Sequence, residues 1–359
     1  MTVTTPTSPT LARTLAAIGP ADAAAHAAAE AHQLQLTKPP GSLGQLETLG
    51  NRLAGMSGAC PPPVPEPALV CVFAGDHGVW AQGVSPWPQA VTAQMVANVA
   101  AGGASVNVLA RHAGADVLVY DLGVAESLPA SGVLRSHRVA AGTADMTLGP
   151  AMTVDQCTRA IEVGIAAADE AVAAGYRCLI AGEVGIGNTT PAAALVSVFT
   201  GRPAAEVTGP GAGAVGPGLA RKMEAVARAI AINAAAPDDP LRALAAVGGF
   251  EHAAIVGFLL GAARHRVPAI LDGVIACSAA LVAVALAPAV RDYLIAGHDG
   301  AEPGIRAALE VLRLDHVIAL ELRLGEGSGA LTALPVVQAA AKILREMATF
   351  ADAGVSGQE

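Results

Sequence analysis

Short apolar runs alternate with longer helical segments through the middle of the chain. Four runs have the length and the apolar character of strands that are buried on both faces, and they cover residues 68–75, 116–124, 177–183 and 268–273. Alternating strands and helices predict an α/β protein with a parallel, doubly wound sheet that is covered by helices on both faces. Ligands of such sheets bind beyond the carboxyl ends of the strands.

Residues 1–60 are predicted to be mostly helical, because they are rich in good helix formers. The Pro-Pro-Gly sequence at residues 39–41 predicts a turn, after which a second helix begins. Ser42 is a candidate N-cap for this helix, and Gln45 has the spacing that completes a capping box.

The two ends of the chain are predicted to pack together. A proline-rich connector at residues 60–67 is the best candidate for a domain boundary, and residues 334–350 predict a helix that returns to the N-terminal helices. We therefore expect N-terminal helices over residues 1–66, a Rossmann-like domain over 67–333 and a C-terminal helix over 334–359.

Charge and cysteine content narrow the class of protein. The chain has 21 basic and 30 acidic residues, and its net charge of −9 argues against a surface for nucleic acid. A small anion needs only a local pocket, so it is not excluded. The five cysteines show neither a CxxC pair nor zinc-finger spacing, which predicts reduced thiols in a cytoplasmic protein. The N-terminus lacks the basic and apolar regions of a signal peptide.

Residues 267–290 are long and apolar enough to resemble a membrane span. However, Asp272, Gly273 and Pro288 interrupt the segment, and strands and helices of a protein core have the same composition. We expect a buried strand and helix here and no membrane contact. A membrane-associated protein without enzymatic activity is the alternative.

A glycine-rich stretch at residues 182–195 follows the third predicted strand and opens a helix. Asn188, Thr189 and Thr190 are candidate N-caps, and Pro191 suits the first helical turn. Exposed amides and the helix dipole make such a helix end an anion site. The stretch lacks the ending of a P-loop, so a nucleoside triphosphate is not expected. A routine capped turn is the alternative interpretation.

Residues 209–216 contain a GxGxxG pattern. No convincing apolar strand precedes it, so a dinucleotide site, and with it an NAD-dependent oxidoreductase, is only an alternative. Lys222, which follows this segment, can reach a phosphate as a point charge. A solvated lysine on a helix face is the simpler interpretation.

Asp76 and His77 follow the first predicted strand. They suit either an acid/base pair or a hydrogen-bonded loop anchor, and no metal is expected because no third ligand has a suitable spacing. Ser85 and Gln94 lie among tryptophan and valine residues, a mixture that suits a flat heterocycle.

Seven motifs resemble those of a known enzyme family. In chain order they cover residues 38–47, 75–85, 182–201, 247–263, 270–281, 287–304 and 322–335. On these motifs the chain resembles the nicotinate-nucleotide–dimethylbenzimidazole phosphoribosyltransferases. The resemblance implies a Rossmann-like large domain, a small helical domain formed from both chain ends, and a homodimer.

The resemblance also implies a reaction. The phosphoribosyl group of nicotinate mononucleotide would pass to 5,6-dimethylbenzimidazole, giving α-ribazole 5′-phosphate and nicotinate for the nucleotide loop of cobalamin. No cofactor is implied. A metal is not required either, because the leaving group is already cationic and the donor has no pyrophosphate. A phosphoribosyltransferase with a pyrophosphate donor and Mg²⁺ is the nearest alternative, although the Asp238-Asp239 pair does not end a predicted strand.

The same resemblance implies roles for individual residues. Glu326 corresponds to the catalytic base and Glu183 to an acid that assists it. The residues that correspond to contacts of the base substrate are Ser85, Gln94 and Leu324. Those that correspond to contacts of the nucleotide and its phosphate are Gly185, Gly187, Asn188, Thr189, Thr190, Lys222, Asp272 and His298. Glycines on both sides of Glu326 allow a close approach of backbone and ring, and an apolar pocket would raise the basicity of its carboxylate.

Overall fold

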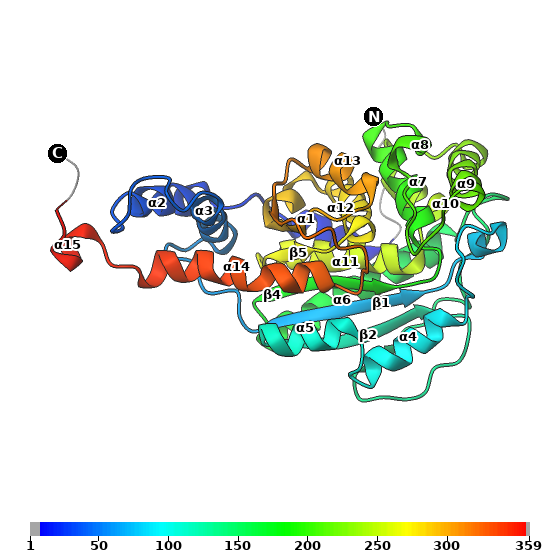
Figure 1. The fold of residues 1–359 in the computed structure, drawn as a ribbon, viewed down its shortest axis with the longest axis horizontal. Coiled ribbons are helices and arrows are strands. Elements are labelled where there is room, and N and C mark those ends of the chain that lie inside the picture. Colours follow the sequence, from blue (N-terminus) through cyan, green and yellow to red (C-terminus); the bar gives the residue numbers. More distant parts are fainter. Residues whose placement is uncertain (1–7, 357–359) are drawn as a thin grey trace.

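The computed structural model describes residues 8–356 and contains one parallel sheet (Figure 1). Seven strands lie in the order β3-β2-β1-β4-β5-β6-β7, and every neighbouring pair is parallel. The strands are β1 (Ala68–Gly75), β2 (Ala115–Gly123), β3 (Leu134–Ser136), β4 (Cys178–Val184), β5 (Ala269–Leu271), β6 (Leu294–His298) and β7 (His316–Ile318). The predicted parallel, doubly wound α/β fold is confirmed.

Helices cover both faces of the sheet. Helices α4, α5 and α14 lie on one face, and α6, α11 and α12 lie on the other (Figure 1). The helices are α1 (Pro9–Ala17), α2 (Ala23–Gln33), α3 (Gln45–Ser57), α4 (Val91–Ala100), α5 (Ser105–Ala113), α6 (Val154–Ala173), α7 (Thr189–Thr200), α8 (Ala204–Val207), α9 (Pro217–Asn233), α10 (Pro240–Val247), α11 (Phe250–Arg264), α12 (Val274–Leu286), α13 (Pro303–Leu312), α14 (Ser328–Glu346) and α15 (Phe350–Ala353), with short 3₁₀ helices η1 (Gly78–Gln82) and η2 (Pro288–Tyr293).

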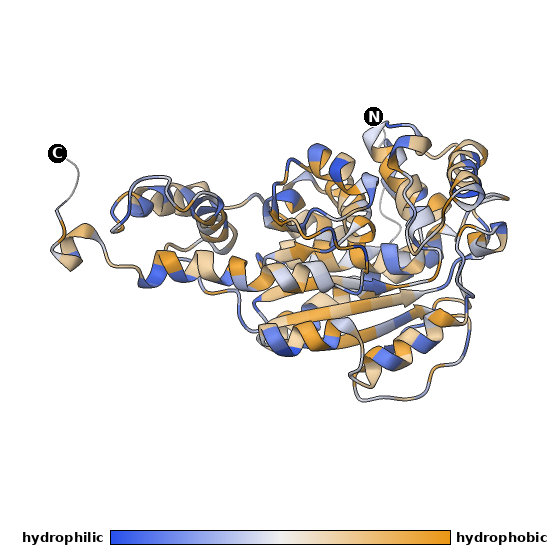
Figure 2. Ribbon diagram, in the orientation of Figure 1, coloured by the Kyte–Doolittle hydropathy of each residue, from blue (hydrophilic) through white to orange (hydrophobic). Residues whose placement is uncertain are grey.

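Small residues allow the helices of the core to approach closely. A Cβ atom placed on Gly164 of α6 would lie 1.8 Å from the carbonyl oxygen of Ala254, and one on Gly257 of α11 would lie 1.9 Å from that of Ile161. The backbones of these two helices therefore touch where they cross. Only glycine and alanine fit into so narrow a gap between two helices. Figure 2 shows the hydrophobic colouring concentrated in the strands and the helices around them.

Helices α2 and α3 pack against the C-terminal part of α14, which projects beyond the sheet (Figure 1). Ala29, Leu36, Ala54 and Leu344 form a small apolar cluster there, and Leu36 forms an isolated β-bridge with Thr349. Helix α14 begins at Ser328, earlier than predicted, and therefore crosses position 334. The division of the chain at residues 66 and 334 stays a prediction.

The predicted capping box at Ser42 is wrong. Helix α3 begins at Gln45 with Gly44 as its N-cap, and no side chain caps it. The Glu47 carboxylate instead accepts hydrogen bonds from the amides of Gly41 and Leu43 and pairs with Lys38 at 2.8 Å. A side chain of the helix itself, that of Glu47, therefore stabilises the turn that precedes the helix.

The apolar segment at residues 267–290 forms β5, α12 and the start of η2, and most of it is buried. No helix among residues 8–356 has both the length and the apolar character that crossing a bilayer requires. The segment belongs to the core of the sheet, as predicted.

Candidate active site

The carboxyl ends of four strands bring most of the candidate site residues to one edge of the sheet. Asp76 follows β1, Gly185 follows β4, Asp272 follows β5 and His298 ends β6. Because parallel strands all end at the same edge, positions far apart in sequence become neighbours there.

Glu326 lies on a strained turn immediately before α14. Its φ angle is +65°, and Gly325 and Gly327 on either side have φ angles of +87° and +91°. Left-handed backbone costs a non-glycine residue about 1 kcal/mol or more, so the surrounding contacts must hold the turn in place. The side chain is only 5% exposed, and one carboxylate oxygen accepts a long hydrogen bond from the amide of Val106 at 3.5 Å. Burial raises the pKa of Glu326, Asp272 adds to this, and the Val106 amide opposes it.

Asp272 accepts hydrogen bonds from the first amides of α14. Its Oδ1 accepts from Gly329 at 2.7 Å and from Ala330 at 3.0 Å, and its Oδ2 accepts from Gly327 at 3.1 Å. An acid at a helix N-terminus satisfies unpaired amides and complements the helix dipole. His298 is buried and lies 3.6 Å from Asp272, with its ring against Gly329. Both residues therefore face the backbone that carries Glu326.

Glu183 is the penultimate residue of the fully buried strand β4 and lies against the Glu326 turn. A Cβ atom on Gly325 would approach Glu183 Oε1 to 2.2 Å, and one on Gly182 would approach the carbonyl oxygen of Glu326 to 2.4 Å. The side-chain amide of Asn188 donates a hydrogen bond to Glu183 Oε2. Burial raises the pKa of Glu183 to about 8, with further raising by Asp272 and other nearby carboxylates and an opposing effect of Asn188. The arrangement is therefore a pair of neighbouring acids that does not favour two negative charges.

The turn from β4 into α7 does not use the predicted side-chain caps. Helix α7 begins at Thr189 after Asn188, whose side chain makes no capping hydrogen bond because its amide turns back to Glu183. Gly187 has a φ angle of +92°, and Thr92 Oγ1 accepts a hydrogen bond from the amide of Ile186 at 3.0 Å. Thr190 is fully buried, and its hydroxyl lacks a partner among residues 8–356.

Lys222 is buried on α9 and points at this turn. It is 1% exposed, and its ammonium donates to Thr189 Oγ1 and to the carbonyl oxygen of Gly209, both at 2.8 Å. Burial lowers the pKa of Lys222 to about 8, and Glu302 opposes this. The interpretation as a solvated lysine is wrong. The ammonium of Lys222 lies beside the N-terminus of α7. An anion at this place would contact both the ammonium and the helix N-terminus.

Glu302 is a site residue that sequence reasoning missed. It is buried, and its Oε1 accepts a hydrogen bond from the amide of Gly211 at 2.7 Å. It thereby holds the segment that closes over Lys222. Residues 296–304, which include Glu302, are rich in glycine, aspartate, glutamate and histidine. Such residues are also common in ordinary turns, so their sequence alone did not single out Glu302.

The GxGxxG segment at residues 209–216 does not form a dinucleotide-binding turn. It connects α8 to α9 and follows no strand, so the strand-to-helix geometry of that motif is absent there. Asp239 of the acidic pair caps α10 by accepting from the amide of Arg242, away from any strand end. Neither alternative function is supported by its motif.

The predicted base-contacting residues have different environments. Ser85 lines a small cavity of about 40 Å³ together with Gly185, Gly187, Asn188 and Thr189. Gln94 lies exposed on α4. Leu324 is 58% exposed, in the loop that leads to Glu326. The structure therefore joins Ser85 directly to the β4–α7 turn and leaves the other two at the surface.

A buried ionic cluster lies beside the turn from β4 into α7. The sequence singled out Asp76 and His77 in it, but not Glu251 and His252. His77 Nε2 lies 2.8 Å from Glu251 Oε1, which lies 2.7 Å from His252 Nδ1. Burial by itself lowers the pKa of His77, but the Glu251 carboxylate outweighs it, so the pKa of His77 is raised. Burial by itself raises the pKa of Glu251, but the two histidines outweigh it, so the pKa of Glu251 is lowered. Asp76 accepts a hydrogen bond from the amide of Ala125 at 2.8 Å and thus anchors a loop. No group of three or more potential ligands in residues 8–356 is arranged for a metal.

Comparison with known proteins identifies the family. A family profile described as "Phosphoribosyltransferase" matches residues 18–355. The nicotinate-nucleotide–dimethylbenzimidazole phosphoribosyltransferase of Salinispora tropica is 54% identical over 360 residues, covering 96% of this chain and 99% of the relative. The enzyme of the same name from a Roseiflexus species is 51% identical over 348 residues, covering 97% and 98%.

Solved structures agree with this relationship. The crystal structure of CobT from Thermus thermophilus superposes with a TM-score of 0.90 at 46% identity, covering 93% of this chain and all of that one. A second crystal structure, of the nicotinate-nucleotide–dimethylbenzimidazole phosphoribosyltransferase from Thermus thermophilus, superposes with a TM-score of 0.88 at 44% identity, covering 94% of this chain and all of that one. The chain therefore belongs to the nicotinate-nucleotide–dimethylbenzimidazole phosphoribosyltransferase family.

Proposed function

We propose that this protein transfers the phosphoribosyl group of nicotinate mononucleotide to 5,6-dimethylbenzimidazole, releasing nicotinate and α-ribazole 5′-phosphate. The observation that carries the proposal is the buried Glu326 carboxylate, with a raised pKa, on a turn at the carboxyl ends of the strands. The named activity of relatives about half identical over nearly the whole chain supports it.

Glu326 acts as the base. One nitrogen of the benzimidazole attacks C1′ of the ribose while nicotinate leaves with the electrons of the glycosidic bond. The other nitrogen then carries a proton that must be removed, and Glu326 accepts it. A raised pKa makes the carboxylate a better acceptor than an ordinary glutamate, and a base positioned for such a transfer contributes roughly 10²–10⁴ in rate.

Glu183 keeps Glu326 ionised. With a pKa of about 8, Glu183 retains its proton at neutral pH. Two adjacent carboxyl groups then share a single negative charge, because ionising both in one buried place is unfavourable. The negative charge resides on Glu326, because its pKa is raised less than that of Glu183. The reaction needs Glu326 in this ionised form.

The phosphate of the nucleotide binds between Lys222 and the start of α7. Lys222 provides the charge, Thr189 a hydroxyl, and the turn at Gly185 and Gly187 the backbone amides. The contacts of Lys222 with Thr189 and Gly209 support this assignment, since they hold the ammonium at a helix N-terminus. Asp272 and His298 act through the Glu326 turn, because their side chains face its backbone and not open space.

A homodimer and a cytoplasmic location complete the proposal. Exposed apolar side chains occur in the loops that carry or flank the site residues, and they are Trp87, Val215, Leu320 and Leu324. A partner subunit would bury them, as expected for an exposed apolar patch. The five cysteines are all free, in keeping with a reducing compartment.

The test is an incubation with nicotinate mononucleotide and dimethylbenzimidazole in EDTA, followed by chromatography. Nicotinate and α-ribazole 5′-phosphate should appear in equal amounts. Absence of both products, also with Mg²⁺ and other bases supplied, would contradict the proposal. Sedimentation of the same preparation should give twice the mass of one chain.

A further inference from the structure

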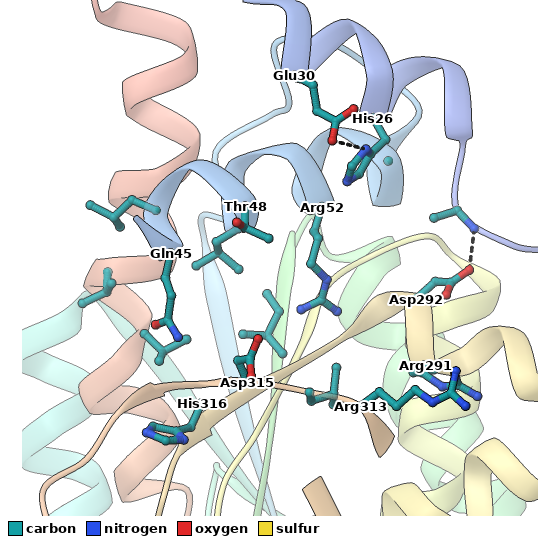
Figure 3. A pocket seen from close by; sticks show the side chains of 18 of the residues that line it. His26, Glu30, Gln45, Thr48, Arg52, Arg291, Asp292, Arg313, Asp315 and His316 are labelled. Carbon is teal, nitrogen blue, oxygen red and sulfur yellow. Dashed lines mark hydrogen bonds and ion pairs between the residues drawn. The ribbon is translucent and has the colours of Figure 1, made fainter. Parts of the chain in front are cut away.

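A cavity of about 820 Å³ lies between α2, α3 and the segment that leads into β7, at the amino ends of the strands (Figure 3). Three arginines and four acids line it. Asp292 and Asp315 raise the pKa of Arg52 against the effect of burial, so charges of both signs compensate one another here. The cavity therefore favours neither an anion nor a cation. A more specific arrangement of buried charges lies at the carboxyl ends of the strands, around His77.

His77 belongs to a buried cluster that the proposed transfer does not use. Its side chain is 1% exposed, and its Nε2 lies 2.8 Å from Glu251 Oε1. The same carboxylate oxygen lies 2.7 Å from His252 Nδ1, and the two histidine rings are 6.1 Å apart at an angle of 85°. A buried ion pair often stabilises a fold no more than apolar residues of the same volume would. The cluster therefore calls for a role besides stability.

Gly185 lies directly against the His77 ring. A Cβ atom on Gly185 would lie 3.2 Å from His77 Nε2 and 2.4 Å from the carbonyl oxygen of Gly75. The Nε2 edge of the ring therefore faces both the Glu251 carboxylate and the backbone of the turn from β4 into α7. Gly185 itself is only half-buried, so the ring supports the turn from its buried side.

The other two residues of the turn have supports of a different kind. The amide of Ile186 donates a hydrogen bond to Thr92 Oγ1 at 3.0 Å. A Cβ atom on Gly187 would lie 3.9 Å from Trp80 Cβ, and the Trp80 amide donates to the carbonyl oxygen of His77 at 3.1 Å. A displacement of His77 would therefore disturb the turn at both of its ends, at one end directly and at the other through η1.

We propose that His77 is a positioning residue for the nucleotide: held by Glu251, its ring fixes Gly185 and with it the turn that receives the phosphate. The identity of the ligand rests on the proposed function, whereas the role of His77 rests on the geometry of the cluster. A displaced turn would present its backbone amides to the phosphate in the wrong direction. The effect of His77 therefore falls on the affinity for the mononucleotide and much less on that for the base.

Gly249 allows the ring to be moved without changing its chemistry. A Cβ atom on Gly249 would lie 2.4 Å from His77 Cε1 and 2.7 Å from Glu251 Oε2, so an alanine there displaces the cluster. The backbone of Gly249 is extended, with φ −137° and ψ 168°, which alanine adopts without strain. Gly249→Ala should therefore resemble His77→Ala in its effect on the nucleotide.

Steady-state kinetics of three variants test the proposal. The KM for nicotinate mononucleotide should rise about tenfold or more in His77→Ala and in Gly249→Ala, and the KM for dimethylbenzimidazole should change much less. His77→Gln should recover most of the affinity, because the glutamine nitrogen occupies nearly the place of Nε2 and still faces Glu251. The matched control is His265→Ala, at a histidine that lies 2.8 Å from Asp169 near the other end of α11, and it should behave as the parent protein.

Hydrogen exchange of backbone amides measures the turn without any turnover. The amide of Ile186 donates to Thr92 and that of Asn188 to the carbonyl oxygen of Gly185, at 3.0 and 3.1 Å. Both should exchange about tenfold faster in His77→Ala than in the parent protein, while the amides of residues 195–200 in α7 stay unchanged. If the parent protein transfers no phosphoribosyl group, the proposed function fails, and exchange still decides whether His77 positions the turn.

Two results would overturn the proposal. One is that His77→Ala leaves the exchange of the turn and the KM for the mononucleotide as they are in the parent protein. The other is an equal rise in the KM of both substrates in His77→Ala without recovery in His77→Gln, since this pattern reflects a general loss of structure. If His77→Ala does not fold, Gly249→Ala takes its place in both comparisons.

Discussion

Asp272 holds the turn that carries Glu326. Its two carboxylate oxygens accept from three amides at the start of α14, and the first of these belongs to Gly327, the next residue after Glu326. The acid that follows β5 thereby fixes the position of the proposed base on a different element. It also acts on that base at a distance, because its negative charge raises the pKa of Glu326.

Asp272→Asn should lower kcat and move the acidic limb of the pH profile of kcat/KM to lower pH. An asparagine accepts fewer hydrogen bonds at the turn, and without the charge of Asp272 the pKa of Glu326 falls. Steady-state rates across the acidic range measure both effects. A merely structural role would reduce kcat and leave the position of the limb unchanged. Asp299→Asn, at an acid that pairs with Arg306, is the control.

Glu326→Gln should retain substrate binding and lose turnover by roughly 10²–10⁴, because the amide is nearly the same size and cannot accept the proton. Single-turnover and steady-state kinetics separate kcat from KM. Glu321→Gln, an exposed glutamate earlier in the same loop, should behave as the parent protein. Turnover near that of the parent in Glu326→Gln would remove the base assignment.

Lys222→Ala should raise the KM for nicotinate mononucleotide by about 10- to 100-fold, the value of one charge-assisted hydrogen bond. The KM for the base should change much less. Lys342→Ala is the matched control, since Lys342 is half-buried on α14 and pairs with Glu66. Equal effects of Lys222→Ala on both substrates would point to a general loss of structure.

The contribution of Glu183 to stability should fall as pH rises from about 4.5 to about 8. Glu183 has an ordinary pKa of 4.5 and a folded pKa of about 8, so the folded state binds more protons than the unfolded state between these values. Each increase in pH in this window therefore weakens the contribution of Glu183 to stability, and that contribution is constant above the window. Thermal unfolding of the parent and of Glu183→Gln at a series of pH values tests this. The variant should show a flatter dependence, and equal slopes would contradict the raised pKa.

Gly257→Ala should destabilise the fold by about 3 kcal/mol or more, because the added Cβ would lie 1.9 Å from the backbone of α6 and the helices must separate. Denaturant unfolding measures the loss. Gly132→Ala is the control, since a Cβ there meets nothing within 4 Å. A change below about 1 kcal/mol in Gly257→Ala would show that α6 and α11 are packed less tightly.

Strands β1, β2, β4 and β5 were predicted from their apolar runs, whereas β3, β6 and β7 were not. Strand β6 is fully buried but has only five residues, one of them a glycine. All eight residues of β1 are buried, so burial on both faces left an unbroken apolar run in the sequence. Strands β3 and β7 have three residues each and are not fully buried, and their sequences carry no such run. The start of α14 was missed for a different reason: the capping group is Asp272, which no local pattern connects to Ser328.

The sequence by itself determined the alternation of strands and helices, the parallel sheet and, through its motifs, the family, because these depend on local periodicity and on ordered short motifs. Only the tertiary structure decided that Lys222 is buried beside Thr189, that Glu302 holds Gly211, and that Glu183 lies against the turn of Glu326. Each of these contacts joins residues on different elements. Burial and the resulting pKa shifts depend on that packing, and sequence spacing carries no record of it.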